Sequence, residues 1–494
     1  MGPRATTGSG DIEGRTRGEV QLFASVPYAA PPTAERRFLA PAPHPGWRGV
    51  RSATRFGPAA PQLPSGGMTS RHEVHWNEDC LTLNIATPAV DEARRPVFFW
   101  IHGGAYQTGQ GNIPWYSGSS FATRGDIVTV SINYRLGALG FADMSRFGPE
   151  YANSGANGLL DMVAALEWVR DNIAAFGGDP DRVTIGGESA GAFATCTLLT
   201  MPAADGLFHR AIAQSGAGHH TVTPDQAAAV GELLLTELGV STLDEALAVE
   251  PRKILDAQVT VQAKIAVDQS LKDDLQLTTQ PFYPVTGSVV PEAPHIAATK
   301  GAGRGVALMT GSNLHETTLF MLEQLDEAGV RRLVAEHSAN VDEILDAYRS
   351  EGITEPHEMA VAISTDWSFR IPAVRMAEAR EPTGAATWLY LFSWESRHRS
   401  LRSTHALEIP FTFNTLDAPG VDVFLGPGDV PYDLGELMHD SWIAFIRTGD
   451  PSTAATGPWP TYCHQGRQVM DFNHNTMLRS DPSGVTREAW ANLR

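Results

Sequence analysis

The chain has 494 residues, of which 42% are hydrophobic, 19% charged and 8% aromatic. This composition is typical of a globular protein with a large core, and it excludes a disordered, collagen-like or coiled-coil chain. The formal net charge is −19, and an acidic surface repels phosphate groups, so we expect neither a nucleic-acid partner nor a membrane partner.

Strand and helix patterns alternate along the first half of the chain. Residues 20–29 and 80–88 predict strands, and residues 97–101 and 127–134 are apolar runs that predict two more. Residues 159–176 place apolar side chains at helical spacing, and the Gly-Gly-Asp-Pro sequence that follows ends this helix. Buried strands that alternate with helices predict an α/β fold with a large, mostly parallel central sheet and helices on both faces.

The second half is more helical, and no segment has the composition of a linker. Residues 225–380 read as mostly helical. We therefore expect a single domain over residues 1–494, with a helical insertion at roughly 225–380.

The cysteines and the N-terminal segment indicate in which cellular compartment the protein is expected. Three cysteines, Cys80, Cys196 and Cys463, are too few for a disulfide framework in a chain of this length. The first eighteen residues lack the apolar core of a secretory signal, and apolar runs such as residues 97–101 are too short to cross a bilayer. These features predict a cytoplasmic protein with free thiols.

A candidate nucleophile lies in the sequence Gly187-Glu188-Ser189-Ala190-Gly191, which matches the pattern G-x-S-x-G. The pattern alone is weak, because a glycine-rich chain can contain it by chance. Here it follows a strand-like segment, residues 183–185, and opens a helix, as a nucleophile elbow does. A sharp strand-to-helix turn needs glycines where a Cβ would collide, and it exposes the serine beside a helix N-terminus. The context therefore predicts Ser189 as a nucleophile.

A serine nucleophile also needs donors for the developing oxyanion. The segment His102-Gly103-Gly104-Ala105-Tyr106 follows the predicted strand at 97–101, where such a loop belongs in hydrolases of this architecture. The N–H groups of Gly103, Gly104 and Ala190 would form a three-donor oxyanion hole. An ordinary glycine turn after a strand is the alternative for this segment.

With these motifs, the chain resembles the type B carboxylesterase and cholinesterase family of α/β-hydrolases, particularly its bacterial p-nitrobenzyl-esterase-like carboxylesterases. The resemblance extends over nearly the whole chain, and it implies the α/β-hydrolase fold. Its landmarks include residues 26–38, 77–85, 100–111, 133–141, 157–191, 208–216, 311–320, 404–413 and 442–451. The stretch from Asp171 to Ala192 is the most specific of them.

The resemblance implies that Glu316 is the catalytic acid and His405 the base, in the hydrolase order serine, acid, histidine. His405 would take the proton of Ser189, and Glu316 would hold the imidazole without becoming protonated. One departure concerns the residue after the acid: relatives usually have glycine, whereas this chain has Thr317. Threonine there requires an ordinary backbone conformation.

Further roles follow from the same resemblance. Phe282 and Phe320 should border the acyl side of the site, with Tyr106 and Gln107 behind the oxyanion loop. Ser215 should support the acid–base pair, with simple core packing as the alternative. Two structural ion pairs are also implied, Arg37 with Glu78 and Arg135 with Asp161.

No metal or cofactor is expected. The histidine pairs His72 and His75, and His219 and His220, lack acidic or cysteine partners at metal-ligand spacing, so loop histidines are the simpler interpretation.

The sequence therefore predicts a serine carboxylesterase that hydrolyses neutral carboxylic esters through an acyl-enzyme. A carbamate or amide hydrolase with the same triad is one alternative. A non-catalytic, cholinesterase-like binding module is a second, from a different class. We expect a small-molecule ester as the partner and a monomeric protein, with an oligomer left open.

Overall fold

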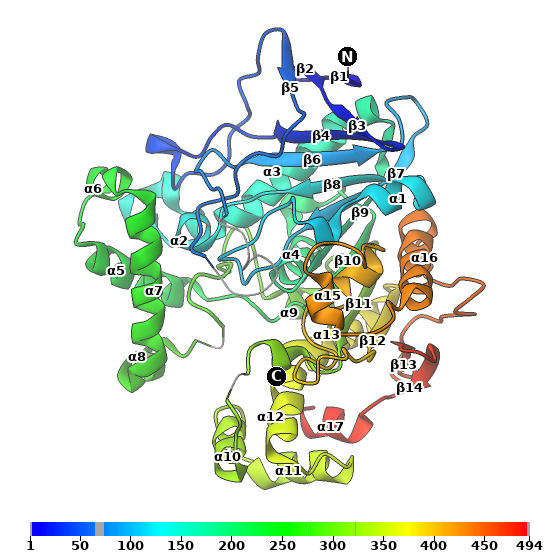
Figure 1. The fold of residues 1–494 in the computed structure, drawn as a ribbon. Coiled ribbons are helices and arrows are strands. Elements are labelled where there is room, and N and C mark those ends of the chain that lie inside the picture. The colour runs from blue at the N-terminus through cyan, green and yellow to red at the C-terminus, as the bar shows by residue number, and fades with distance from the viewer. Residues whose placement is uncertain (1, 65–73, 278, 322, 492–494) are drawn as a thin grey trace. The chain divides into compact units, whose positions relative to one another are not determined.

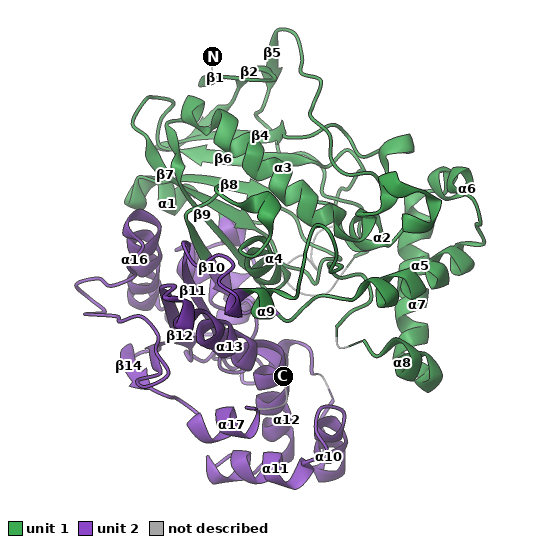
Figure 2. Ribbon diagram, turned by 180° about the vertical axis from the view of Figure 1, so that it is seen from behind, with its two compact units in different colours: residues 1–113, 117–211, 219–297 green, residues 114–116, 212–218, 298–494 purple. Residues whose placement is uncertain are grey.

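The structure is a computed structural model that describes residues 2–64, 74–277, 279–321 and 323–491. Two compact units make up the chain, as Figure 2 shows by colour. Unit 1 contains residues 1–113, 117–211 and 219–297, and unit 2 contains residues 114–116, 212–218 and 298–494. The single domain over residues 1–494 stays a prediction.

Unit 1 is built on a mixed sheet whose strands are labelled in Figure 1. Its strand order is β9-β7-β8-β6-β4-β3. Strand β7 is parallel to β8 and β9, whereas β6 is antiparallel to β8 and β4. The bounds are β3 Arg15–Arg17, β4 Val20–Pro27, β6 Thr82–Thr87, β7 Arg95–Ile101, β8 Val128–Ile132 and β9 Gly178–Glu188. A separate small sheet contains β1 Arg4–Thr7, β2 Gly10–Glu13 and β5 Val50–Ser52.

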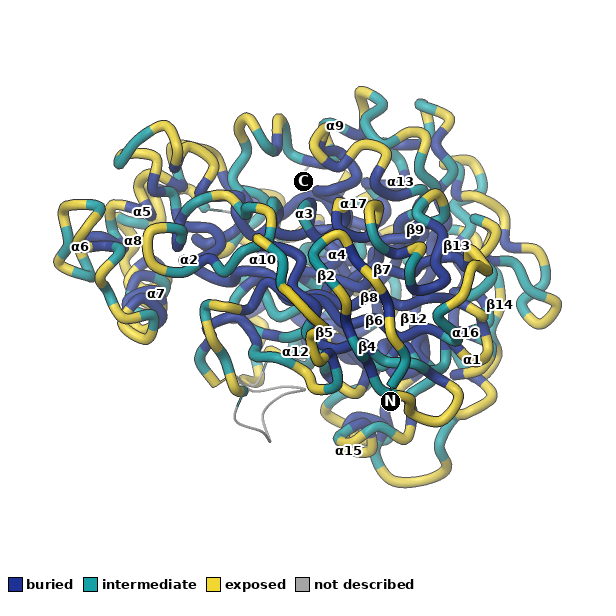
Figure 3. Tube along the Cα trace, turned by 90° about the horizontal axis from the view of Figure 1, so that it is seen from above, coloured by how far each residue is buried: buried dark blue, intermediate teal, exposed yellow. Residues whose placement is uncertain are grey.

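The continuous apolar runs of the sequence form the buried strands of unit 1. Every residue of β6, β7 and β8 is buried, and the tube in Figure 3 is dark blue along these strands but largely yellow around α6. A strand that is buried on both faces has no polar side to alternate with its apolar side. This is why these segments lack the alternation of a half-exposed strand.

The helices of unit 1 include the one predicted at 159–176. It forms α3, Asn157–Asn172, and continues as a 3₁₀ turn, Ile173–Phe176, which ends at Gly177 with φ of 77°. The others are α1 Ser119–Gly125, α2 Gly137–Phe141, α4 Ala190–Leu198, α5 Pro224–Leu238, α6 Leu243–Ala248, α7 Pro251–Val267, α8 Gln269–Leu275 and α9 Pro294–Thr299, whose last residues belong to unit 2.

Both predicted ion pairs are present in unit 1. Arg37 Nε lies 2.6 Å from Glu78, and Arg135 Nη2 lies 2.7 Å from the fully buried Asp161. Arg37 also donates to the carbonyls of Leu247, at 2.8 Å, and Val249, at 2.7 Å. The buried guanidinium groups are thus fully hydrogen-bonded, as their burial requires, and the two predictions are confirmed.

Unit 2 has its own parallel strands. Strand β12 (Thr387–Phe392) is parallel to β11 (Ala307–Asn313) and to β13 (Gln468–Phe472), and β14 (Met477–Ser480) is antiparallel to β13. Strand β10 spans Arg210–Gln214, of which the first two residues belong to unit 1 and the last three to unit 2. The region 225–380 is therefore not continuously helical, because β11 interrupts it.

The helices of unit 2 pack partly around a separate apolar cluster that joins α10, α11, α12 and the C-terminal α17. Their bounds are α10 Glu327–Ala335, α11 Val341–Ser350, α12 Pro356–Thr365, α13 Ile371–Arg380, α14 Ile409–Thr412, α15 Val421–Leu425, α16 Tyr432–Thr448 and α17 Gly484–Ala489. A π-helical turn, Asp366–Arg370, connects α12 to α13. Among the described residues, no helix is long and apolar enough to span a membrane.

Candidate active site

Ser189 lies at the turn between β9 and α4, and it is the only residue between them. Its backbone has φ of 56° and ψ of −123°, a conformation that costs a non-glycine residue about 1–3 kcal/mol. Ser189 is half-buried, whereas Glu188 and Ala190 on either side of it are buried. The strained turn therefore leaves the Ser189 side chain partly accessible, whereas the residues on either side of it are buried.

Two glycines make the turn sterically feasible. A Cβ on Gly191 would lie 2.0 Å from the carbonyl oxygen of Ile101, and one on Gly187 would lie 2.5 Å from the Gly191 carbonyl. No real Cβ contact is that short, so both positions require glycine. The prediction that this turn needs glycine is confirmed at Gly187 and Gly191.

The loop from His102 to Thr108 lies directly against this turn. A Cβ on Gly103 would lie 2.7 Å from the Glu188 carbonyl oxygen and 3.0 Å from Ser189 Cβ. Gly104 has φ of 111°, and its carbonyl accepts hydrogen bonds from the N–H groups of Gln107, at 2.9 Å, and Thr108, at 3.0 Å. The two glycines therefore bring the loop backbone up to the serine.

Three backbone donors are unused at this place. Within the described part of the chain, the N–H groups of Gly103, Gly104 and Ala190 donate no hydrogen bond to the protein itself. Ala190 is the first residue of α4, where N–H groups have no partner within the helix. Unused donors beside a serine are suited to bind a developing oxyanion.

His102 anchors the loop, a role that the sequence did not reveal. Its Nδ1 lies 2.8 Å from the Gly103 carbonyl oxygen, and its ring stacks on Tyr134 at 4.5 Å between centroids. The Tyr134 hydroxyl donates to the His102 carbonyl at 2.8 Å. Burial lowers the pKa of His102 to about 4, so the ring is neutral at pH 7.

Three of the predicted pocket residues belong to unit 1. Tyr106 is fully buried, with its ring 4.8 Å from Phe141 and 5.2 Å from Tyr283. Gln107 accepts a hydrogen bond from Gln258 at 3.4 Å. Phe282 is fully buried. Tyr106 therefore acts as packing beneath its own loop, and the role of all three toward substrate stays a prediction.

The predicted acid and base form a tight pair in unit 2. His405 Nδ1 lies 2.6 Å from Glu316 Oε2, and the Asn313 N–H donates to Glu316 Oε1 at 2.7 Å. The N–H of His405 also donates to the Glu316 carbonyl at 3.2 Å. Glu316 is fully buried and His405 nearly so. Both carboxylate oxygens are engaged, and the Glu316 carboxylate orients the His405 ring through Nδ1.

A second buried carboxyl, Glu408, lies behind this pair. Asn313 Nδ2 donates to Glu408 Oε2 and to the Thr404 carbonyl, both at 2.7 Å, and Gln214 Nε2 donates to Glu408 Oε1 at 3.2 Å. Burial, followed by the charge of Glu316, raises the pKa of Glu408 to about 7. Glu408 was not predicted from the sequence, although an acid in the apolar segment Ala-Leu-Glu-Ile-Pro-Phe was a signal for it.

Thr317 follows the acid in an ordinary backbone conformation, as its replacement of glycine requires. It is the second residue of the 3₁₀ turn Glu316–Leu319. Its hydroxyl donates to the Val361 carbonyl at 3.1 Å, and its N–H donates to Thr365 Oγ1 at 3.4 Å. Both bonds tie the acid-bearing turn to α12, and the one donated by the hydroxyl is a link that glycine could not make.

Two phenylalanine rings flank the base. Phe320 lies 5.2 Å from the His405 ring and is 58% exposed, and Phe369 lies 4.9 Å from the same ring and is buried. Phe320 was predicted near the site, whereas Phe369 was not. Phe369 lies in the π-helical turn Asp366–Arg370, and such turns are frequent at functional sites.

The remaining residues that were considered from the sequence are a serine and several histidines. Ser215 is buried with φ of 52°, and its hydroxyl has no hydrogen-bond partner among the described residues; its supporting role stays a prediction. His219 stacks on His295, and His220 stacks on Phe193. His72 lies outside the described residues. In the part of the chain that is described, no three His, Cys, Asp or Glu side chains gather as a metal site would require.

Comparisons with known proteins identify the family of the chain. The model of the carboxylesterase family matches residues 2–490. The chain is 36% identical to para-nitrobenzyl esterase of Bacillus subtilis (strain 168), covering 98% of this chain and 97% of that protein. It is 37% identical to phenmedipham hydrolase of Pseudarthrobacter oxydans, covering 93% of each.

A solved structure supports the fold. Carboxylesterase Est55 of Geobacillus stearothermophilus is similar with a TM-score of 0.87 and 37% identity, over 99% of each chain. The predicted α/β-hydrolase fold is therefore confirmed, as is the prediction of a serine carboxylesterase that hydrolyses carboxylic esters. By its sequence over nearly its full length, this chain belongs to the carboxylesterase family.

Proposed function

We propose that Ser189, His405 and Glu316 are the catalytic triad of this carboxylesterase. The observation that carries the proposal is the Glu316–His405 hydrogen bond of 2.6 Å in unit 2, together with the strained, half-buried Ser189 in unit 1. The acid–base pair in unit 2 and the serine turn in unit 1 each have the geometry that catalysis requires. An acid fixes the imidazole tautomer, and a turn presents the nucleophile.

The proposed reaction has two stages. Ser189 Oγ attacks the ester carbonyl carbon while His405 Nε2 takes the hydroxyl proton, and the oxyanion accepts hydrogen bonds from Gly103, Gly104 and Ala190. The C–O bond of the ester then breaks, and the alcohol leaves with the proton from His405. Water repeats the sequence on the acyl-enzyme and releases the acid. The three unused N–H donors support this assignment of the oxyanion hole.

We propose neutral esters with short acyl groups of about two to six carbons as substrates, because aromatic rings near the reacting groups crowd longer chains. Phe320 and Phe369 flank the base within 5.2 Å, which supports crowding there. Phe282 would border the acyl group, with Tyr106 and Gln107 behind the oxyanion loop. No cofactor takes part in this scheme.

A panel of p-nitrophenyl esters from acetate to dodecanoate tests this proposal, with aryl carbamates and anilides alongside. We expect kcat/KM to peak at short acyl groups and to fall for long ones. Phe282→Ala should move the optimum to longer chains, and Phe147→Ala in a turn of unit 1 serves as the matched control. A wild-type optimum at dodecanoate would refute the acyl-pocket assignment and leave the triad standing.

The same experiment separates the reaction classes. If carbamates or anilides were hydrolysed with a higher kcat/KM than every ester, the proposed preference for esters would be wrong. We also propose that the enzyme is a cytoplasmic monomer. Cys80, Cys196 and Cys463 are not joined by a disulfide among the described residues, which supports a reducing compartment.

A further inference from the structure

A buried glutamine of unit 1, Gln62, contacts the loop that carries the proposed oxyanion donors. Gln62 is 2% exposed, and its side-chain amide makes three hydrogen bonds. Nε2 donates to the Gly109 carbonyl at 2.8 Å and to the Ala60 carbonyl at 3.1 Å, and Oε1 accepts from the Gly109 N–H at 2.9 Å. Both protons of the amide and its oxygen are therefore engaged.

Gly109 is a buried residue whose two backbone polar groups both pair with this side chain. Among the backbone hydrogen bonds of the described residues, none involves the N–H or the carbonyl of Gly109. Strand β7 ends at Ile101, and residues 102–113 form neither a helix nor a strand. Buried polar groups in such a loop need side-chain partners. Gln62 therefore supplies the pair of bonds that a neighbouring strand would otherwise supply.

Gly109 in turn packs against the peptide that joins Gly103 to Gly104. A Cβ on Gly109 would lie 2.4 Å from the Gly103 carbonyl oxygen and 2.4 Å from His102 Nδ1. The backbone of Gly109 has φ of 106°, a conformation that favours glycine. The carbonyl of Gly103 and the N–H of Gly104 belong to the same planar peptide. A displacement of Gly109 would therefore also displace the Gly104 N–H, one of the three unused donors.

We propose that Gln62 is a positioning residue of the oxyanion hole, because it holds Gly109 against the Gly103–Gly104 peptide. This role rests on the proposed function, in which the Gly104 N–H donates to the oxyanion. In a trans peptide the C=O and the N–H point in opposite directions, so a contact that fixes the Gly103 carbonyl also fixes the Gly104 N–H. Two neighbours fix that carbonyl, namely His102 Nδ1 at 2.8 Å and Gly109.

The position of this donor determines how well it stabilises the transition state. Oxyanion donors act at about 2.7–3.1 Å from the oxygen, and a misplacement of about 1 Å can lower a rate by about 10²-fold. Without the Gln62 amide, the buried N–H and carbonyl of Gly109 lose their partners, and the loop must shift to pair them again. The loss should affect kcat more than KM, because these donors bind the oxyanion more tightly than the ester carbonyl.

Steady-state kinetics of the full-length variant Gln62→Leu with p-nitrophenyl acetate test this role. We expect kcat to fall by about 10–100-fold and KM to change by less than about threefold. The matched control is Gln226→Leu on α5 of the same unit. The Gln226 amide likewise accepts one backbone N–H, at 2.9 Å, and donates to two carbonyls, at 3.0 and 3.1 Å. Its kcat should equal that of the wild type, and equal kcat in the two variants would overturn the proposal.

A second variant tests the hydrogen bonds directly and covers the case in which Gln62→Leu does not fold. Gln62→Glu keeps the shape of the side chain and the acceptor for the Gly109 N–H, but its carboxylate would face the carbonyls of Gly109 and Ala60 without a donor. Burial raises the pKa of such a carboxyl, and its protonated form can again donate one hydrogen bond.

The activity of Gln62→Glu should therefore recover as the pH falls. We expect the ratio of its kcat to that of the wild type to rise at least about threefold from about pH 8.5 to about pH 6. Taking the ratio at each pH removes the titration of the catalytic base, which is common to both enzymes. A ratio near one at both pH values, or a low ratio that does not rise, would overturn the role of these hydrogen bonds.

Ser189→Ala, assayed beside these variants, separates the role of Gln62 from the proposed function. An inactive Ser189→Ala together with a slow Gln62→Leu would support both. If Ser189→Ala is inactive and Gln62→Leu is as active as the wild type, only the positioning role of Gln62 is wrong. If Ser189→Ala keeps its activity, the triad assignment is wrong, and the role of Gln62 is wrong with it.

Discussion

The two halves of the candidate site are held in place by different means. In unit 1, the nucleophile turn and the oxyanion loop depend on backbone geometry, since glycines at 103, 187 and 191 allow segments to approach within distances that a Cβ forbids. In unit 2, side chains do the positioning, because Asn313, Glu408 and Gln214 form a buried hydrogen-bond network behind the acid.

This difference determines how each half should respond to mutation. A single added Cβ in the glycine turns should cause a large loss of stability, because the backbone cannot move away from the clash without disrupting the packing around it. A polar network fails in graded steps, because each hydrogen bond contributes about 0.5–3 kcal/mol. The predictions below test that contrast, from the largest expected effect to the smallest.

Removing the nucleophile should have the largest effect on activity. Ser189→Ala should lower kcat by about 10⁴-fold or more, since members of a triad act as a unit. The melting temperature should stay within a few degrees of the wild type, because the half-buried hydroxyl contributes little packing. Steady-state kinetics and thermal unfolding measure both, with the exposed Ser400→Ala as control. A tenth of the wild-type rate in Ser189→Ala would refute the assignment.

Adding one methyl group to the turn should break the nucleophile half outright. In Gly191→Ala the new Cβ would lie 2.0 Å from the Ile101 carbonyl oxygen, so strand and helix must separate, at a cost of more than about 3 kcal/mol. Gly305→Ala, where no heavy atom lies within 4 Å, should unfold like the wild type. Equal unfolding free energies of the two variants in urea would show that the turn tolerates a side chain.

Neutralising the acid should damage activity less completely. Glu316→Gln keeps the shape but replaces the acceptor of the His405 Nδ1 proton, so kcat should fall by about 10²–10⁴-fold. Glu323→Gln, an exposed acid after the same turn, is the matched control and should retain full activity. A loss below about tenfold in Glu316→Gln would mean that another residue orients the base.

The buried Glu408 predicts a pH-dependent stability. Its pKa is raised from 4.5 to about 7, so the folded state favours the protonated carboxyl. That stability is present below pH 4.5 and is lost as the pH rises through 7. The free energy of unfolding, wild type minus Glu408→Gln, should therefore fall by up to ~3 kcal/mol between pH 4.5 and pH 8. Urea unfolding at the two pH values measures it, and a constant difference would show that Glu408 does not titrate in this range.

The sequence alone determined the parts of this protein that depend on neighbouring residues. The alternation of apolar runs with helical spacing predicted the strands and helices, because burial on both faces produces uninterrupted apolar segments. The Gly-x-Ser-x-Gly turn and the His-Gly-Gly loop were readable because glycine marks the positions where backbone segments meet. The roles of Glu316 and His405 were predicted from the family resemblance. No local sequence pattern indicates that two residues 89 positions apart form a hydrogen bond.

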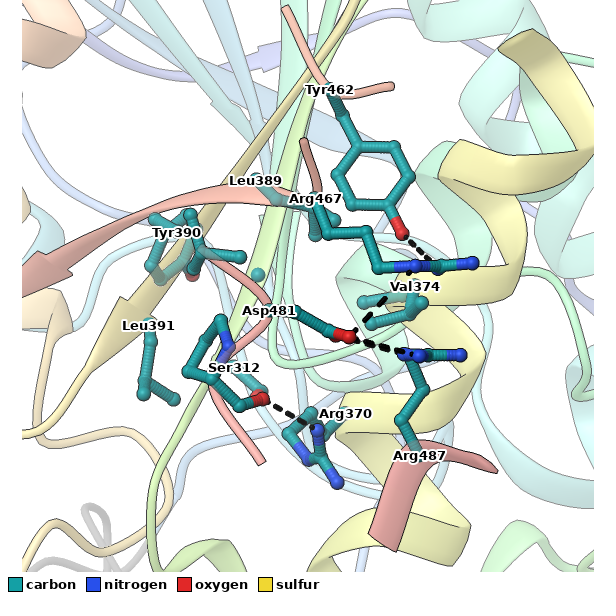
Figure 4. Close-up of a pocket in the computed structure, with 14 residues that line it drawn as sticks. Ser312, Arg370, Val374, Leu389, Tyr390, Leu391, Tyr462, Arg467, Asp481 and Arg487 are labelled. Atoms are coloured by element: carbon teal, nitrogen blue, oxygen red, sulfur yellow. Dashed lines mark hydrogen bonds and ion pairs between the residues drawn. The ribbon is translucent and has the colours of Figure 1, made fainter. Parts of the chain in front are cut away.

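Only the tertiary structure decided which polar side chains are buried together. Glu408 meets Gln214 across 194 positions and Asn313 across 95, so no local pattern marks it as an acid with a raised pKa. Phe369 lies in the π-helical turn, and its ring is 4.9 Å from the His405 ring, 36 positions away in the chain. A small cavity lined by Arg467 and Arg487 lies where α13, β12 and the segment after β14 meet (Figure 4). The burial of a side chain and its charged partners depend on which residues pack around it. These neighbours come from distant parts of the chain, so the sequence order does not reveal them.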